Sequence, residues 1–322
     1  MEFGYTMLCE QTPPKQLVAD LVTAEAAGYD FSVISDHYFP WLEEQGHSAY
    51  AWSVLGAAAQ ATERIPLMTF VTCPIMRYHP AVVAQKAATM GVLSDGRFSL
   101  GLGAGENLNE HVVGHGWPSA DLRHEMLAEA VEIIGTLFEG DYVNYHGVHF
   151  DVDSAKLYDL PDRPVPIAIA AGGKRAATLA GEFADAIVAT EPRADIVEEF
   201  DETGGAGKPR YGQLVISYDT DAAAARERAH RLWRWGTGGW KVMSELPGPR
   251  NFAAHAEHVR PEDVAELVTC GPDLDAYVEA VGAYAEAGFT HLAIVQVGAD
   301  RQKEFLTWSQ AELLPALRRR FG

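Results

Sequence analysis

The sequence has little cysteine, no long hydrophobic run and no basic N-terminal segment. Its three cysteines, Cys9, Cys73 and Cys270, are widely spaced, which argues against a disulfide framework and predicts a reducing, cytoplasmic compartment. No apolar run approaches the ~20 residues that a membrane-spanning helix needs, so no membrane contact is expected. Residues 1–5 lead directly into an apolar stretch, which predicts the absence of a signal peptide.

Basic side chains are also scarce. The chain has 45 Asp and Glu residues against 25 Lys and Arg, a formal charge of −20. A protein that binds nucleic acid needs a basic stripe along the phosphate backbone, and none is present, so the expected partner is a small molecule. Acidity of this kind commonly serves solubility. An anionic ligand would need a local positive site to overcome it.

No glycine follows the first predicted strand, residues 2–7, in the segment 8–14. A doubly wound dinucleotide-binding fold requires a Gly-rich turn at that point. The triplet Gly101, Gly103 and Gly105 instead follows the fourth strand and ends at Glu106. This position favours a barrel over the doubly wound alternative.

Strand-like and helix-like stretches alternate along the whole chain, and most of the strands are apolar on both sides, as a buried parallel sheet requires. The pattern predicts an α/β fold, a single (β/α)8 TIM barrel over residues 1–322 with insertions. A β-hairpin is expected near 141–150, and a Gly- and Pro-rich lid near 235–259. The predicted strands are 2–7, 31–34, 65–71, 98–102, 165–170, 186–189, 214–218 and 291–297, and the predicted helices are 15–27, 81–93, 123–138, 174–183, 221–233, 274–287 and 303–320.

Titratable and polar residues gather where these strands end. Asp36, His37 and Trp41 follow the second strand, and Glu106 and Asn109 follow the fourth. Catalytic groups of a (β/α)8 barrel lie at the carboxyl ends of its strands, so these side chains are expected to face one cavity. The same reasoning adds three further segments, namely Phe70-Val71-Thr72, Gly103-Ala104-Gly105 and Ala171-Gly172-Gly173.

Four motifs in this order resemble the coenzyme F420-dependent branch of the luciferase-like superfamily, and within it the glucose-6-phosphate dehydrogenase group. The resemblance implies a luciferase-like TIM barrel, F420 as cofactor, a cytoplasmic homodimer and a dehydrogenase reaction on an alcohol or sugar carbinol. A flavin mononucleotide-dependent monooxygenase of the same superfamily is the alternative. The motifs are Ser35-Asp36-His37 with Trp41, Met76-Arg77-Tyr78-His79-Pro80-Ala81-Val82, Gly103-Ala104-Gly105-Glu106-Asn107-Leu108-Asn109-Glu110 and Ala170-Ala171-Gly172-Gly173.

The resemblance assigns roles that chemistry supports. His37 is the expected base for the hydroxyl proton, since an imidazole titrates near working pH. Glu106 is expected to protonate the cofactor, provided that an apolar pocket raises its pKa. Asp36 is expected to contact the deazaflavin and to orient His37, and Trp41 to donate an N–H or wall the pocket. Core packing for His37 and Trp41, and helix capping for Glu106, are the structural alternatives.

The remaining cofactor contacts follow from the same resemblance. They comprise a cis peptide between Phe70 and Val71, with Thr72 beside it, and the residues Gly105 and Asn109. Backbone N–H groups at a helix start attract phosphate, so Ala171, Gly172 and Gly173, which precede the helix at 174, are expected to hold the phosphodiester; a plain turn is the alternative.

The expected substrate side departs from the sugar-phosphate enzymes. Arg193 falls near the position of one phosphate-binding lysine, with Glu191 beside it, and Ala254 falls near another. An arginine flanked by a carboxylate in an acidic chain is a poor phosphate clamp, so we expect an uncharged alcohol rather than glucose 6-phosphate. No metal site is expected, because the first strand carries no His-x-His pair.

Overall fold

A closed parallel barrel forms the centre of the molecule. The computed structural model describes residues 1–322, and eight of its strands pair in the order β1-β2-β3-β4-β7-β8-β9-β11, with β11 returning to β1. The predicted (β/α)8 barrel is therefore confirmed. Its strands are β1 (Glu2–Met7), β2 (Phe31–Ile34), β3 (Leu67–Thr69), β4 (Phe98–Leu102), β7 (Ile167–Ala170), β8 (Ala186–Val188), β9 (Arg210–Ser217) and β11 (His291–Gln296).

Two clusters of buried apolar residues pack the barrel. Alternate residues of several strands, among them Phe31 and Val33 of β2 and Met68 of β3, form one small buried cluster. A larger cluster of 64 buried residues includes residues of the strands and of the helices around them. A strand buried on both faces has no polar side, which explains the uninterrupted apolar runs of the sequence.

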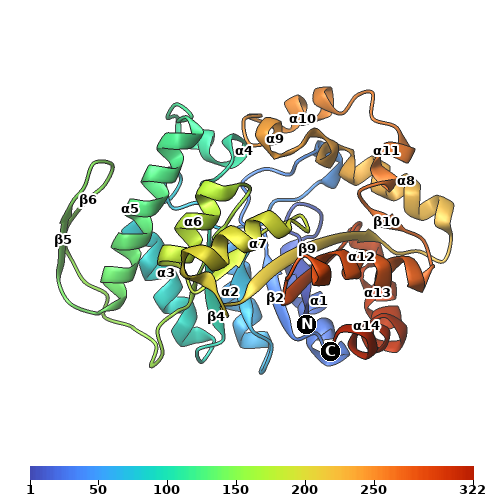
Figure 1. The fold of residues 1–322 in the computed structure, drawn as a ribbon, viewed down its shortest axis with the longest axis horizontal. Coiled ribbons are helices and arrows are strands. Elements are labelled where there is room, and N and C mark those ends of the chain that lie inside the picture. Colours follow the sequence, from blue (N-terminus) through green and yellow to red (C-terminus); the bar gives the residue numbers. More distant parts are fainter.

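The helices surround the barrel, and the two chain ends meet, with the Met1 amino group 2.7 Å from the Phe321 carbonyl (Figure 1). α2 and α7 were missed in the sequence, and the predicted helix 303–320 is divided by a π-turn at Ser309–Leu313. The helices are α1 (Pro14–Ala27), α2 (Ala51–Ala61), α3 (Pro80–Leu93), α4 (Asn107–Glu110), α5 (Ala120–Phe138), α6 (Lys174–Phe183), α7 (Ala194–Phe200), α8 (Ala222–Trp233), α12 (Leu274–Glu286), α13 (Gln302–Trp308) and α14 (Leu314–Phe321). None of them is long and apolar enough to cross a membrane.

Two segments interrupt the alternation. The predicted hairpin is present as antiparallel β5 (Val143–His146) and β6 (Asp151–Ala155) (Figure 1). The predicted bounds of 141–150 were too short, because the whole second strand lies beyond residue 150. The Glu129 carboxylate holds its tip by accepting N–H bonds from residues 148–150. The second segment, expected as a Gly- and Pro-rich lid near 235–259, contains two short helices, α9 (Trp240–Met243) and α10 (Pro249–His255). The short elements continue beyond residue 259 as α11 (Pro261–Ala265) and β10 (Thr269–Cys270).

Candidate active site

A buried ion pair joins the ends of β1 and β2. His37 Nδ1 lies 2.8 Å from Glu10 Oε1, and the Ser35 hydroxyl donates to Glu10 Oε2 at 2.7 Å. His37 Nε2 lies 4.0 Å from Glu106 Oε2, beyond hydrogen-bonding distance. His37 and Glu106 are therefore brought together as predicted. The prediction that Asp36 orients His37 was wrong, because Glu10 occupies that position.

Burial and neighbouring charge tune both groups. Desolvation alone would lower the pKa of His37, but the Glu10 and Glu106 carboxylates outweigh it and raise this pKa to about 9. Desolvation raises the pKa of Glu106 to about 7 against the opposing effect of His37. Glu106 precedes α4 without making a side-chain capping bond. Near neutral pH these shifts favour a protonated imidazole, and they bring the ionisation of the Glu106 carboxyl group into the neutral range.

Asp36 lies at the centre of a separate network. Its Oδ2 accepts from the Thr72 hydroxyl at 2.7 Å and from Trp52 Nε1 at 3.1 Å. Its Oδ1 accepts from Arg77 Nη2 at 3.1 Å and from the Tyr78 hydroxyl at 3.3 Å. Four donors hold this carboxylate in one orientation, and they come from the end of β3, from α2 and from the loop before α3.

Arg77 links this network to a second buried carboxylate. Its backbone N–H donates to Glu110 Oε2 at 2.7 Å, and its Nε lies 3.5 Å from Glu110 Oε1. Burial raises the pKa of Glu110 to about 7, although Arg77 opposes the shift. From the sequence, Arg77 and Glu110 were recognised only as members of two motifs, with no role assigned, and Glu10 was not recognised as a site residue. The position of Glu10, three residues beyond β1, was the available signal.

Trp41 belongs to an aromatic stack that contacts His37. Its ring lies 4.9 Å from the His37 ring, edge to face, and stacks on Trp235 at 4.0 Å with an interplanar angle of 7°. Phe252 of α10 packs edge-on against Trp41 at 5.0 Å. Trp41 is 5% exposed, so the structural alternative, core packing, is observed. Its role as a wall of the cofactor pocket stays a prediction.

Backbone constraints shape the ends of β3 and β4. The peptide bond between Phe70 and Val71 is cis, as the resemblance implied. Gly105 has φ +78, and a Cβ there would lie 2.4 Å from Cys73 Sγ. Asn109 Oδ1 accepts the N–H of Tyr38 at 2.9 Å, so it orders the loop that carries His37.

The turn after β7 leads into α6. Ala171 is buried, Gly173 precedes the first residue of the helix, and a Cβ on Gly173 would meet nothing within 4 Å. The Trp240 ring covers Gly172, since a Cβ there would lie 3.0 Å from Trp240 Cδ1. An open glycine at a helix start is a suitable cradle for a phosphate group.

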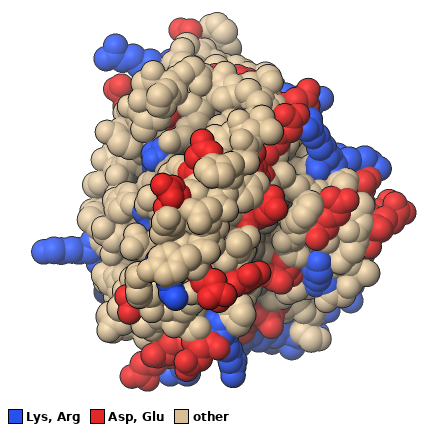
Figure 2. Space-filling view, turned by 90° about the vertical axis from the view of Figure 1, so that its left-hand side faces the viewer, with Lys and Arg blue, Asp and Glu red and all other residues tan.

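Arg193, the cationic side chain expected to bind the substrate, already forms an ion pair within the protein. Arg193 Nε and Nη2 bond both oxygens of Asp195 at 2.9 and 2.5 Å. The neutralising carboxylate is therefore Asp195, whereas Glu191 was the expected neighbour. Figure 2 shows Asp and Glu side chains spread across one face of the molecule, with no continuous patch of Lys and Arg.

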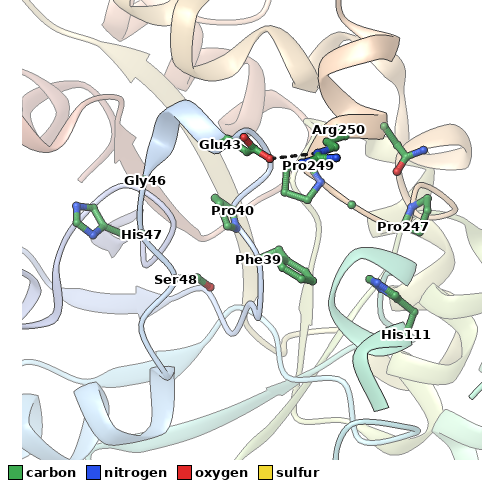
Figure 3. Close-up of a pocket in the computed structure, with 12 residues that line it drawn as sticks. Phe39, Pro40, Glu43, Gly46, His47, Ser48, His111, Pro247, Pro249 and Arg250 are labelled. Atoms are coloured by element: carbon green, nitrogen blue, oxygen red, sulfur yellow. Dashed lines mark ion pairs between the residues drawn. The ribbon is translucent and has the colours of Figure 1, made fainter. Parts of the chain in front are cut away.

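A hollow of about 660 Å³ adjoins the loop that carries His37 (Figure 3). Phe39 and Pro40 form one wall, and the 247–251 segment forms another. The Ser48 hydroxyl in this hollow donates to the His37 carbonyl at 3.1 Å. Its one arginine, Arg250, lies 3.7 Å from Glu43. No group of three or more His, Cys, Asp or Glu side chains is placed to hold a metal ion.

Comparison with known proteins agrees with this geometry. The luciferase-like monooxygenase family model matches residues 1–291. The F420-dependent glucose-6-phosphate dehydrogenase of Beutenbergia cavernae is 38% identical over 99% of this chain and 98% of its own length, and that of Microbacterium testaceum is 35% identical over 100% and 99%. A solved F420-dependent secondary alcohol dehydrogenase, in complex with an F420–acetone adduct, is 31% identical, covers 98% of this chain and 99% of its own, and superposes with a TM-score of 0.90.

Proposed function

We propose that this chain, which belongs to the luciferase-like monooxygenase family, is an F420-dependent oxidoreductase that moves a hydride between the deazaflavin and an uncharged alcohol or its carbonyl counterpart. The observation that carries the proposal is the buried Glu10–His37–Glu106 series at the strand ends. When bound, the deazaflavin supplies the hydride acceptor and donor. The fit is supported by the fixed Asp36 carboxylate and the open Gly173 turn.

In this proposal His37 handles the proton of the substrate oxygen. In oxidation, Nε2 takes the hydroxyl proton while the same carbon loses its hydride, so a carbonyl forms. In reduction, Nε2 returns that proton to the carbonyl oxygen. Glu10 holds Nδ1, which keeps Nε2 directed at the reacting group. Trp41 forms a wall of the site. Glu106 is the carboxyl group that gives a proton to the cofactor in oxidation and takes it back in reduction.

The raised pKa values give a specific pH dependence. Oxidation needs a neutral His37 and a protonated Glu106, whereas reduction needs the opposite pair. Because the pKa of His37 is about 9 and that of Glu106 about 7, the form that suits reduction is the major one between those values. Both directions should show a bell-shaped kcat/KM with limbs near 7 and 9, and they should differ in height.

We also propose roles for the other residues near the cofactor. Phe70, Val71 and Thr72 would support the ring, Gly105 and Asn109 would order the two loops beside it, and Ala171, Gly172 and Gly173 would cradle the phosphodiester. An uncharged substrate is favoured because Arg193 and Arg250 are paired with carboxylates. A cytoplasmic homodimer of one domain rests on the family resemblance, and sedimentation tests the dimer.

An anaerobic assay tests the function. The purified protein is offered F420 or flavin mononucleotide, and deazaflavin absorbance is followed with secondary alcohols, ketones, glucose and glucose 6-phosphate. We expect F420 binding and turnover with uncharged alcohols or ketones. In a parallel aerobic assay, flavin binding with oxygen consumption would overturn the cofactor. In the anaerobic assay, efficient turnover of glucose 6-phosphate would overturn the substrate class. An Arg193→Ala variant that keeps wild-type KM would support a role for Arg193 outside substrate binding.

A further inference from the structure

A buried lysine side chain without a hydrogen-bond acceptor lies behind the Asp36 network. The Nζ of Lys86, on α3, has less than 1 Å² of exposed surface and no hydrogen-bond partner. Three aromatic rings surround it instead. Nζ lies 3.1 Å from the ring centroid of Tyr78, 5.2 Å from that of Tyr50 and 5.3 Å from that of Trp52.

Two of these rings are the donors that hold Asp36. The Tyr78 hydroxyl donates to Oδ1 and the Trp52 indole to Oδ2. An ammonium over an aromatic face is attracted by the ring quadrupole, and the attraction strengthens when water is excluded. The cation therefore restrains the orientation of both rings and, through them, the two oxygens of Asp36.

We propose that Lys86 is a positioning residue for Asp36, and that its charge sets the affinity of the site for the deazaflavin cofactor through Tyr78 and Trp52. The inference rests on the proposed function in one respect, the contact of Asp36 with the cofactor. It adds a buried residue that acts through Tyr78 and Trp52 and that no motif of the sequence indicated.

The charges around Lys86 predict that its effect depends on pH. Desolvation lowers the pKa of its ammonium to about 8, opposed by the Asp36 carboxylate and assisted by Arg77. The other groups that face it are the Tyr50 and Tyr78 phenols, and burial raises the pKa of Tyr78 well above its ordinary value. Lys86 is thus the group of this cluster that loses its charge between pH 7 and 9.

Three variants test the positioning role by F420 titration. Lys86→Met should raise the F420 Kd about tenfold, because the loss of the desolvated cation–π contacts leaves Asp36 to be ordered on binding, while kcat at saturating F420 stays within about twofold. Lys86→Arg should restore most of the affinity. Lys303→Met, which removes an exposed lysine of α13, should change neither quantity. In an Asp36→Asn background, Lys86→Met should have no further effect. Unchanged affinity in Lys86→Met, or an equal loss in both backgrounds, would overturn the proposal.

A measurement on the cofactor-free protein separates this inference from the proposed function. The indole N–H resonance of Trp52, assigned with Trp52→Phe, should shift with a midpoint near pH 8 in the wild type. The shift should be absent in Lys86→Met and in Lys86→Arg up to pH 10. Between pH 7 and 9 the F420 affinity should fall more in the wild type than in Lys86→Arg, because His37 and Glu106 titrate in both proteins and Lys86 only in the wild type. If the wild type binds no F420, the proposed function is wrong. If the pH-dependent shift of the Trp52 resonance is the same in the wild type and in the Lys86 variants, this inference is wrong.

Discussion

Glu10 Oε1 and His37 Nδ1 lie 2.8 Å apart at the ends of two adjacent barrel strands, where the Glu10 side chain is fully buried. The Ser35 hydroxyl donates a hydrogen bond to the second carboxylate oxygen of Glu10. Burial would raise the pKa of Glu10, but His37 and these hydrogen bonds outweigh it and keep the carboxylate ionised. A charged partner on Nδ1 therefore determines both the orientation and the charge of His37.

Glu10→Gln should move the alkaline limb of kcat/KM downward. Without the Glu10 charge the pKa of His37 should fall below its value of about 9, because Glu106 alone then opposes the desolvation that lowers it. More of the imidazole is then neutral at pH 7, but its ring is less firmly held. The pH profile of kcat/KM in both directions measures the change, with Ser48→Ala as the control. An alkaline limb that stays near 9 would contradict the assignment to His37.

Glu106→Gln should remove the limb near pH 7 and lower kcat by about 10²–10⁴-fold, the usual contribution of a positioned acid or base. Glu110 offers a matched control, because burial raises its pKa to about 7 as well and its carboxylate is committed to Arg77. Glu110→Gln should therefore keep the limb. If the limb disappears in Glu110→Gln and persists in Glu106→Gln, the two roles are exchanged.

Gly105→Ala should destabilise the fold and displace the loop of Glu106. The new Cβ would meet Cys73 Sγ at 2.4 Å in a left-handed backbone, and the combined cost should be about 2–4 kcal/mol. Gly114 has φ +83, and a Cβ there would meet nothing within 4 Å, so Gly114→Ala isolates the backbone cost, about 1–2 kcal/mol. Denaturant unfolding measures both. Equal losses in the two variants would refute the steric argument.

Asp20→Asn should stabilise the protein at alkaline pH. Asp20 is buried in α1, its Oδ2 has no partner, and desolvation raises its pKa to about 6. The unfolded carboxyl ionises near 3.9, so the folded state binds more protons and loses stability as the pH rises from about 4 to 6. The variant should gain about 1–2 kcal/mol at pH 8 and nothing at pH 3.5.

Urea unfolding at both pH values checks this result. Glu279→Gln, which removes an exposed carboxylate of α12, should leave the unfolding free energy unchanged at either pH. A gain of equal size at pH 3.5 and pH 8 would show that ionisation of Asp20 is not its cause.

Local patterns predicted most of the barrel, because buried parallel strands are apolar on both faces and Gly and Pro mark element ends. Helix α1 begins at Pro14 and ends before Gly28, whose φ is +92. Helix α2 is rich in alanine, and two of the four residues on its exposed face, Ser53, Ala57, Gln60 and Ala61, are alanines, so no polar face marked it in the sequence. The π-turn at Ser309–Leu313, which divides the predicted helix 303–320, was not predicted, because a π-turn is a local departure from helix geometry with no residue type that marks it.

The sequence by itself determined which residue types stand at the strand ends, since the chain order of strands dictates which loops share the carboxyl rim of a closed barrel. Asp36, His37, Trp41 and Glu106 follow from that rule. Tertiary structure alone decided their partners: Glu10 rather than Asp36 beside His37, Asp195 rather than Glu191 on Arg193, and Lys86 among the rings that hold Asp36. Contacts between distant segments depend on side-chain direction and desolvation, and both exist only when the barrel is closed.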